Sequence, residues 1–295
     1  MKFVTFMLDG VETIGILTKD EKRIVRIKDV LGENAPNTLV ELIENFSNEY
    51  RIALKNAEGN YEEFDIEKVI MKAPIPVPRR GIICLGKNYG EHVKEVPSNI
   101  DFKNGVPEHP IYFLKLVDEA VAHGGNILLN TDITNQLDYE AELAVVIGKE
   151  CKNIPKDKVE EYIFGYTIIN DISARDTQAK HVQWFYGKSL DGTCPMGPCI
   201  VDKSEISFPP ELDIKCYVNG ELRQNSNTRE FIFDIPYIIS EFSKGVTLKP
   251  GDIIATGTPA GVGMGFNPKK FLKDGDEVVC VVEGVGMLRN SVLGE

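Results

Sequence analysis

The stretch LDYEAELAVVIG, residues 137–148, joins a row of acids to a dense apolar run. Its acids, Asp138, Glu140 and Glu142, occupy alternate positions. Successive side chains of a β-strand point to opposite faces of the sheet, so all three carboxylates would share one face. The apolar run that follows is typical of a strand in the protein core. The stretch therefore predicts a rigid core strand that presents several like charges in one direction.

The chain on either side of this stretch divides into two regions of different character. Residues 1–73 contain short strand-like runs and one helix, whose start is predicted by the capping-box spacing of Thr38 and Glu41. The segment APIPVPRR, residues 73–80, has three prolines and is expected to be a stiff, extended connector. We therefore expect a small N-terminal α/β domain over residues 1–73 and a larger domain over residues 74–295.

From residue 81 onward the sequence is dominated by short β-patterned runs that glycine and proline interrupt. Only a few helices are predicted, including one from near Pro155 to before Gly165 and another from Asp234 to Gly245. Strand–helix–strand alternation is not sustained, which argues against a doubly wound parallel sheet. These patterns predict an α+β fold that is mostly β, with a mixed roll or barrel-like sheet.

The composition indicates a globular protein and excludes several classes of partner. Of the 295 residues, 42% are hydrophobic and 26% are charged, as in soluble proteins with a sizeable core. The formal net charge of −12 argues against a nucleic-acid partner, because phosphates attract basic surfaces. Asp9 interrupts the N-terminus before a signal peptide could form, and no apolar run reaches membrane length. We therefore expect a cytoplasmic protein without a membrane partner.

The six cysteines form no CxxC pair of the kind that binds zinc. In a chain expected to be cytoplasmic, scattered thiols are typically reduced and packed in the interior. Cys194 and Cys199 lie five residues apart and could form a disulfide or a metal site. Burial of two small side chains is the favoured interpretation.

Glu140 and Glu142 are the first candidates for a chemical role. On a strand they would lie side by side and repel each other, and burial would raise their pKa values. A divalent cation removes that conflict, and oxygen ligands suit Mg²⁺, Ca²⁺ or Mn²⁺. A solvated strand face is the alternative interpretation. Asp171, at the end of the apolar run in GYTIINDISARDTQ (residues 165–178), could add a third ligand or cap a helix that starts near Ser173.

His92 and Glu95 are spaced so that one helical turn places them on a common face. A carboxylate that orients an imidazole is the usual construction of a general base, although an exposed polar pair would show the same spacing. The polar segment that follows, residues 96–110, could be a mobile lid or a long surface loop.

A glycine-rich stretch, GDIIATGTPAGVGMG at residues 251–265, runs from a predicted strand into a loop. It does not form a dinucleotide site, because no helix follows and Pro259 breaks the motif. Its backbone N–H groups could approach an anion such as a carboxylate, and Thr256 and Thr258 could add hydroxyl donors. A tight turn without a ligand is the alternative interpretation.

Six motifs occur here in an order that resembles the fumarylacetoacetate hydrolase family: GKNYGEHVKE, YFLK, DYEAELAVVIG, GYTIINDISARDTQ, GKSLDGTCPMGP and LKPGDIIATGTPAGVG. The resemblance spans about residue 80 to residue 293, and residues 1–73 resemble the family's variable N-terminal domain more loosely. The resemblance implies a mixed β-sandwich roll with a small N-terminal α/β domain, usually assembled as a homodimer.

The resemblance also implies roles for individual residues. Glu140, Glu142 and Asp171 match the carboxylates that hold Mg²⁺ or Mn²⁺, and Ca²⁺ would suit the same oxygens. Asp138 lies outside this ligand pattern, so we expect it to pair elsewhere and support the site from behind.

Further positions match the family's catalytic groups and its substrate pocket. Lys188 matches a lysine near the metal, and His92 and Glu95 match a dyad that activates water. The positions that match the substrate pocket are Lys115, Arg175, Gln178 and Thr258. One departure follows Lys115, where YFLKLVDEAVAHGG lacks the proline or small polar residues that are common in the family. This departure leaves the shape of the pocket and the substrate open.

The activity that we expect first is that of a Mg²⁺-dependent hydrolase. Such an enzyme would cleave a C–C bond in an acylpyruvate-like β-diketo acid through a metal-bound enolate, with water activated by the His–Glu dyad. An isomerase or decarboxylase of 2-hydroxyhepta-2,4-diene-1,7-dioate or oxaloacetate-type substrates is the alternative, because the same site can stabilise an enolate in either reaction. A metal- or keto-acid-binding protein without turnover is disfavoured, because base, lysine and ligands occur together.

Overall fold

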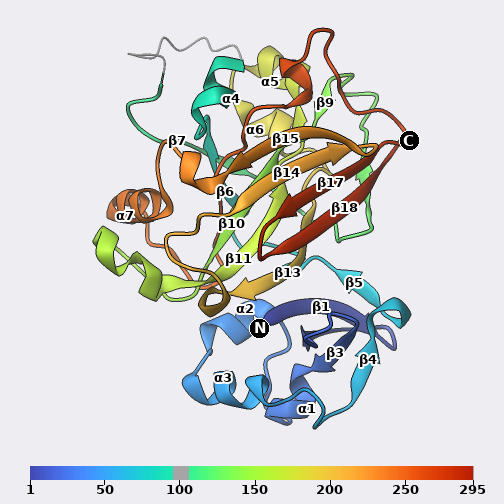
Figure 1. Cartoon of the computed structure of the whole chain (residues 1–295), viewed down its shortest axis with the longest axis vertical. Helices are drawn as coiled ribbons and strands as arrows, with labels where there is room; N and C mark the ends of the chain where they lie inside the picture. Colours follow the sequence, from blue (N-terminus) through green and yellow to red (C-terminus); the bar gives the residue numbers. More distant parts are fainter. Residues whose placement is uncertain (96–105, 295) are drawn as a thin grey trace.

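The computed structural model describes residues 1–95 and 106–294. Figure 1 shows a β-rich body with the N-terminal segment at one end of its long axis. The backbone of this body is an 11-stranded sheet, in which β5 (Ile70–Lys72) pairs with β1 beside the main path. Along that path the strands are β4 (Glu63–Asp65), β3 (Arg23–Arg26), β2 (Val11–Leu17), β1 (Lys2–Leu8), β13 (Met196–Asp202), β11 (Ile163–Asn170), β10 (Ala141–Ile147), β16 (Ile253–Ala255), β6 (Ile82–Gly86) and β7 (Ile111–Lys115).

A second sheet of five strands packs against the middle of the first (Figure 1). Its order is β15 (Glu221–Asn227), β14 (Asp213–Val218), β17 (Glu277–Val282), β18 (Gly286–Leu293) and β8 (Asn126–Leu128). A short pair, β9 (Leu137–Asp138) and β12 (Ser173–Ala174), lies beside the ends of β10 and β11. Most pairings are antiparallel, but β16–β6 and β18–β8 are parallel. The mostly-β, mixed-sheet fold predicted from the sequence is therefore confirmed.

The helices are short and lie at the edges of the sheets (Figure 1). The α-helices are α1 (Ile27–Leu31), α2 (Leu39–Glu44), α3 (Asn48–Lys55), α4 (Gly90–Glu95), α5 (Arg175–His181), α6 (Trp184–Lys188) and α7 (Ile235–Gly245). The 3₁₀ turns are η1 (Ile66–Lys68), η3 (Lys156–Tyr162), η4 (Lys203–Glu205), η5 (Thr228–Glu230) and η6 (Gly263–Gly265). Within the described ranges, every helix is too short or too polar to cross a membrane.

Two of the predicted helix starts carry the expected caps. The Thr38 hydroxyl accepts a hydrogen bond from the Glu41 N–H, and the Asp234 carboxylate accepts one from the Tyr237 N–H. The predicted helix after Pro155 is instead the 3₁₀ segment η3. Its sequence KDKVEEY buries only Val159. This segment has no apolar stripe to pack a full α-helix against the sheet, which explains the difference.

Strand β10 lies at the centre of the fold, and all seven of its residues are buried. Leu143 and Val145 belong to the core between the two sheets, together with residues of β14 and β17 such as Cys216 and Cys280. Ala144 belongs to the other core, which includes the apolar faces of the N-terminal helices. The alternation of side chains therefore gives β10 two different buried faces, and Glu140 and Glu142 continue the face of Ala144.

The N-terminal segment joins the larger region through backbone and side chains. Strand β1 pairs with β13 at Lys2–Val201 and Phe3–Ile200, and the ring of Phe3 packs on that of Phe164. The 11-stranded sheet therefore runs through both regions. The assignment of residues 1–73 and 74–295 as separate domains stays a prediction.

All six cysteines are free and buried, as the sequence predicted. Burial raises the pKa of the thiols of Cys194 and Cys199 to about 12, so both are protonated at neutral pH. Neither thiol is therefore prepared to ligate a metal or attack a disulfide.

An ion pair between the two regions gives a testable prediction about stability. Arg51 of α3 donates two hydrogen bonds, of 2.7 and 2.6 Å, to the carboxylate of Asp202, whose side chain is fully buried. Burial would raise the pKa of Asp202, but the hydrogen bonds from Arg51 and Ser204 outweigh it and lower the pKa below its usual 3.8. Replacing Arg51 with alanine leaves this buried carboxylate without its cation and should cost about 1–3 kcal/mol of unfolding free energy at pH 7.

The pH dependence of this loss follows from the lowered pKa of Asp202. Its stabilising contribution is present above the unfolded-state pKa and is lost as the pH falls through the lower folded-state pKa. Urea unfolding at pH 7 and near pH 3 should therefore show a smaller difference between wild type and Arg51→Ala at the lower pH. Arg229→Ala, at an exposed side chain, is the matched control. An equal difference at both pH values would contradict the role of Asp202.

Candidate active site

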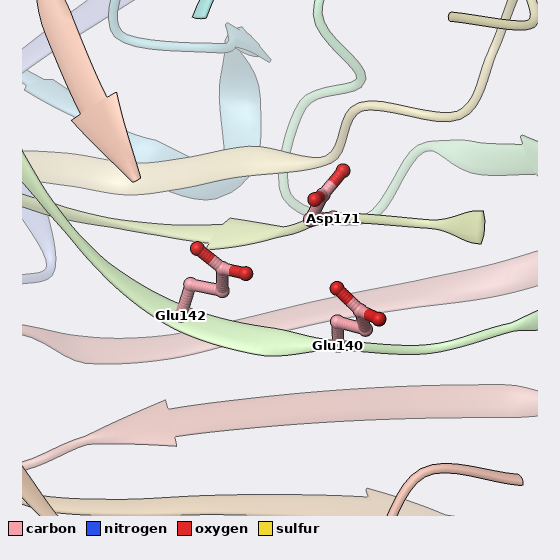
Figure 2. A group of neighbouring side chains, drawn as sticks. All are labelled: Glu140, Glu142 and Asp171. Atoms are coloured by element: carbon pink, nitrogen blue, oxygen red, sulfur yellow. The ribbon is translucent and has the colours of Figure 1, made fainter. Parts of the chain in front are cut away.

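Three carboxylates gather on one face of the 11-stranded sheet. Glu140 directly precedes β10, Glu142 lies within it, and Asp171 directly follows β11. Ala141 pairs with Asn170 in this antiparallel ladder, which places Glu140 opposite Asp171. The Asp171 N–H also donates a 2.8 Å hydrogen bond to the Glu140 carbonyl. Figure 2 shows the three side chains as neighbours, with Glu140 and Glu142 on one strand and Asp171 at the end of the next.

The donor set of this cluster fits a hard divalent cation. One carboxylate oxygen from each residue lies within 4.8 Å of the others, and all three side chains are buried. Burial, followed by the negative charges of Asp171 and Glu140, raises the pKa of Glu142 well above its usual value. A cation among these oxygens would remove the repulsion, and carboxylate ligands suit Mg²⁺, Mn²⁺ or Ca²⁺.

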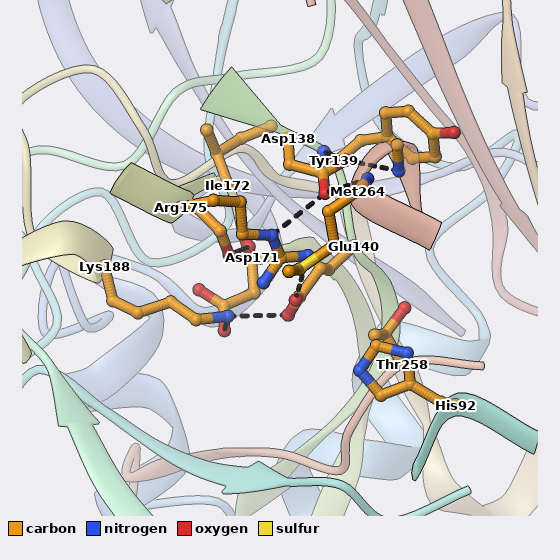
Figure 3. Close-up of polar contacts among 12 residues, drawn as sticks. His92, Asp138, Tyr139, Glu140, Asp171, Ile172, Arg175, Lys188, Thr258 and Met264 are labelled. Carbon is orange, nitrogen blue, oxygen red and sulfur yellow. Dashed lines mark hydrogen bonds and ion pairs between the residues drawn. The ribbon is translucent and has the colours of Figure 1, made fainter. Parts of the chain in front are cut away.

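Two buried cations flank the carboxylates. The Lys188 ammonium of α6 donates hydrogen bonds of 2.6 Å to Glu140 and 2.5 Å to Asp171. The Arg175 guanidinium of α5 lies 2.7 Å from another oxygen of Glu140 (Figure 3). Burial alone would raise the pKa of Glu140, but Lys188 and Arg175 outweigh it and lower the pKa to about 2. Glu140 is therefore ionised at neutral pH even in the metal-free protein.

Lys115 lies behind the cluster. Its side chain is fully buried, and its ammonium donates to the carbonyl oxygens of Ile172 and Lys188 and lies 3.1 Å from Asp171 Oδ1. All of these partners of the Lys115 ammonium are groups of the protein itself. They place Lys115 as a support for Asp171, and contact with a substrate stays a prediction.

Asp138 pairs outside the cluster, as expected. It is fully buried and accepts hydrogen bonds from Arg175 Nε at 2.9 Å, from the Gly263 N–H at 2.6 Å and from the Met264 N–H at 3.0 Å (Figure 3). Because Arg175 also contacts Glu140, Asp138 fixes the cation that flanks a candidate ligand.

The helix-cap interpretation of Asp171 is not supported. Helix α5 begins at Arg175 rather than near Ser173, and no side chain caps its N-terminus. The Asp171 carboxylate instead points to Lys188 and Lys115. Lys188, the last residue of α6, and Lys115 therefore contact the carboxylate that the helix-cap interpretation assigned to the first turn of α5.

His92 and Glu95 share one face of α4, and His92 Nδ1 lies 3.3 Å from Glu95 Oε2. Glu95 in turn accepts hydrogen bonds of 2.9 and 3.1 Å from the Gly261 N–H. Because Nδ1 faces Glu95, Nε2 is the ring nitrogen of His92 that could exchange a proton with another group. The imidazole is buried, and after Lys188 and Arg175 it is a further group that lowers the pKa of Glu140. Figure 3 draws His92 together with the residues of the cluster. The predicted dyad is therefore formed next to the carboxylate cluster, whereas most of residues 96–110 lie outside the described ranges.

Two further predicted substrate contacts have different surroundings. The Thr258 hydroxyl donates a 2.9 Å hydrogen bond to the Ala141 carbonyl and accepts one of 2.7 Å from Gln224. Gln178 is half-buried on α5, against Gly187 of α6. The structure thus engages Thr258 with Gln224 and with the backbone of β10, and substrate contact by Thr258 or Gln178 stays a prediction.

Several residues of the site carried no recognisable signal in the sequence. Asn170 accepts a hydrogen bond from the Glu140 N–H, and buried Gln224 accepts one from the Ala141 N–H and donates to the Pro259 carbonyl. The Gly257 N–H donates a 2.8 Å hydrogen bond to Glu142. Gln224 stands in the polar run RQNSN, which resembles any exposed strand edge. Gly257 lies in the glycine-rich stretch 251–265. The sequence predicts that N–H groups of this stretch approach a carboxylate, but it does not indicate which carboxylate.

Comparisons with known proteins find a matching family model and similar proteins. Residues 81–293 match the model of the fumarylacetoacetate (FAA) hydrolase C-terminal domain. The chain is 44% identical over 298 residues to oxaloacetate tautomerase YisK of Bacillus subtilis (strain 168), covering 98% of this chain and 96% of that protein.

Solved structures share the fold over the whole chain. A fumarylacetoacetate hydrolase from psychrophilic Exiguobacterium antarcticum is 37% identical, with a TM-score of 0.86 and full coverage of both chains. A maleylpyruvate hydrolase from Sphingobium sp. SYK-6, in complex with manganese(II) ion and pyruvate, is 28% identical, with a TM-score of 0.78 and coverage of 100% of this chain and 99% of that one. Both the sequence and the fold therefore group this chain with enzymes.

Proposed function

Because the chain belongs to the fumarylacetoacetate hydrolase family, we propose that it is an isomerase that interconverts the enol and keto forms of a small 2-oxo dicarboxylic acid such as oxaloacetate. The observation that carries this proposal is the 44% identity to an oxaloacetate tautomerase over 98% of the chain. The comparisons thus favour the isomerase alternative over the hydrolase that the sequence suggested first.

We propose that Glu140, Glu142 and Asp171 hold Mg²⁺ or Mn²⁺. Their buried carboxylates and close oxygens support this assignment, as does the manganese in the maleylpyruvate hydrolase structure. A divalent cation bound there would act as a Lewis acid toward the 2-oxo group of the substrate.

The charges of the site favour an anionic substrate once a cation is bound. Asp138, Glu140, Glu142 and Asp171 supply four carboxylates, against the three cations Lys115, Arg175 and Lys188. With all four carboxylates ionised, these seven groups carry a single negative charge, which a divalent cation would reverse. The resulting positive field would attract a dicarboxylate and would stabilise the negative charge that develops on the substrate oxygen.

His92 supplies the proton transfer in this proposal. Interconversion of an enol and a ketone moves a proton between the oxygen and the neighbouring carbon. His92 Nε2 is the candidate acceptor and donor, because Nδ1 is directed to Glu95. Glu95 orients the ring, so that the same nitrogen can take up and return the proton.

Hydrolysis remains the second candidate, since the same dyad could activate water and the maleylpyruvate hydrolase shares the fold. The two activities, and decarboxylation, differ in their products. Enol oxaloacetate should lose its ultraviolet absorbance faster with the protein and Mg²⁺ than without either. Pyruvate and CO₂ assays on the same samples report decarboxylation, and carboxylic-acid release from an acylpyruvate panel reports hydrolysis. Loss of an acylpyruvate without faster tautomerisation would refute the isomerase and favour the hydrolase.

A homodimer and a cytoplasmic location remain predictions. Strand β7 forms one edge of the large sheet, and Leu114 and Leu116 are exposed there. We propose that a second copy of the chain covers this edge, because an exposed apolar strand edge is otherwise a site of aggregation. Light scattering after size-exclusion chromatography should give twice the chain mass of 32.9 kDa, and a monomeric mass would contradict this proposal.

A further inference from the structure

The glycine-rich loop beside the dyad contacts two carboxylates of the protein itself. The Gly261 N–H donates to Glu95, and the N–H groups of Gly263 and Met264 donate to Asp138. The loop therefore lies between the dyad and the residue that fixes Arg175. Its N–H groups bind carboxylates, as the sequence suggested, but these belong to the chain rather than to a ligand.

The three glycines in this loop exclude a side chain for two different steric reasons. A Cβ at Gly261, where φ is +106°, would lie 1.9 Å from the Arg223 carbonyl oxygen, and one at Gly263 would lie 2.3 Å from the Lys270 carbonyl oxygen. Those contacts are with backbone, so a side chain there would distort the loop. A Cβ at Gly265 would instead lie 1.9 Å from Glu95 Oε1, and its three nearest atoms all belong to the Glu95 side chain.

We propose that the loop of residues 261–265 holds the Glu95 carboxylate in place, and we call this loop the seat of Glu95. We also propose that Gly265 is a positioning residue for the catalytic dyad. This proposal rests on the proposed function, in which His92 transfers the proton. The Gly261 N–H fixes the Glu95 carboxylate from one side, and the missing side chain of Gly265 leaves the space that the carboxylate fills. Glu95 seated in this way holds His92 Nδ1, and so directs Nε2.

The far side of the seat is anchored to the carboxylate cluster. Asp138 holds the Gly263 and Met264 N–H groups and also accepts from Arg175, whose guanidinium contacts Glu140. A continuous chain of polar contacts thus connects a candidate metal ligand with the carboxylate that orients the base. The seat fixes the distance between the two halves of the site.

Gly265→Ala tests the seat without destroying the loop. The three atoms nearest to the added methyl all belong to the flexible side chain of Glu95, so Glu95 should move while the backbone stays. We expect kcat for tautomerisation to fall about 10–100-fold, because a displacement of about 1 Å in a catalytic group has effects of that size. KM and Mg²⁺ affinity should stay within about twofold, since the loss falls on proton transfer rather than binding. Gly245→Ala is the matched control, because a Cβ there meets no atom within 4 Å.

A double-mutant cycle separates positioning from a general structural effect. In a Glu95→Ala background the methyl at residue 265 finds empty space, so the second substitution should change kcat by less than about twofold. If the fold-losses of kcat measured for Glu95→Ala and Gly265→Ala alone multiply in the double variant, the proposal is overturned. An unchanged kcat in Gly265→Ala would also overturn it.

The seat itself can be tested without any substrate. Amide hydrogen exchange at Gly261 should become faster in Glu95→Ala and in Gly265→Ala, because the N–H loses its acceptor, and should be unchanged in Gly245→Ala. Unchanged exchange in both loop variants would refute the seat. If exchange responds as expected but the wild type does not tautomerise oxaloacetate, the seat stands and the proposed function fails.

Discussion

Replacing Glu142 with glutamine should abolish metal-dependent turnover while leaving the metal-free protein at least as stable as the wild type. The substitution removes a candidate ligand and one of three mutually repelling charges, but it keeps the shape of the side chain. Burial and the charges of Asp171 and Glu140 raise the pKa of Glu142, so its ionisation costs stability when no cation is present. That cost grows as the pH rises above the usual pKa of a glutamate, and a neutral amide does not incur it.

The measurement is thermal unfolding of both proteins with and without Mg²⁺, together with the tautomerase assay. A ligand at 100 times its Kd stabilises the folded state by about 2.7 kcal/mol, so saturating Mg²⁺ should raise the Tm of the wild type. Glu142→Gln should show no such increase and at least a ~10³-fold loss of activity, on the scale of losing an electrostatic catalyst. Glu12→Gln, at an exposed position of β2, is the control. A Mg²⁺-dependent rise in the Tm of Glu142→Gln would contradict its role as a ligand.

His92→Ala should lower turnover by about 10²–10⁴-fold, the usual contribution of a general acid–base group, without weakening Mg²⁺ binding. His92 contacts Glu95 rather than any of the three candidate ligands, so its loss leaves the carboxylate cluster intact. Isothermal titration with Mg²⁺ and initial rates of tautomerisation check the two halves of this prediction.

His181→Ala provides the control, because that imidazole is exposed at the end of α5. A His92→Ala protein with wild-type turnover would show that another group transfers the proton. Loss of Mg²⁺ affinity together with activity would instead show that His92 belongs to the metal site.

The part of the site carried by β10 and β11 was predictable from the sequence. The alternation of Glu140 and Glu142 before an apolar run requires only that the segment be a strand, and the structure has it as one. The position of Asp171 at the end of β11 follows from the same rule, applied to a second apolar run. Short-range periodicity therefore determines which face each carboxylate occupies.

Other contacts depend on distant parts of the chain and could not be predicted in this way. The seat of Glu95 is formed by Gly261, which is 166 residues away, and no local pattern records that distance. Lys115, which lies on β7, is fully buried and its ammonium lies 3.1 Å from Asp171 Oδ1, a contact between distant segments that no local pattern indicates. The segment after Pro155 is a 3₁₀ helix rather than the predicted α-helix, because Val159 is the only residue in it that is buried.

The most direct test of the central claim is anomalous X-ray diffraction from crystals soaked in Mn²⁺. The account predicts a strong anomalous peak bounded by the carboxylates of Glu140, Glu142 and Asp171, with one oxygen of each within bonding distance of the ion. Lys188, whose ammonium donates hydrogen bonds to Glu140 and Asp171, should then have moved away from one of them. Crystals with no peak at these three side chains, at a Mn²⁺ concentration that supports turnover, would contradict the account.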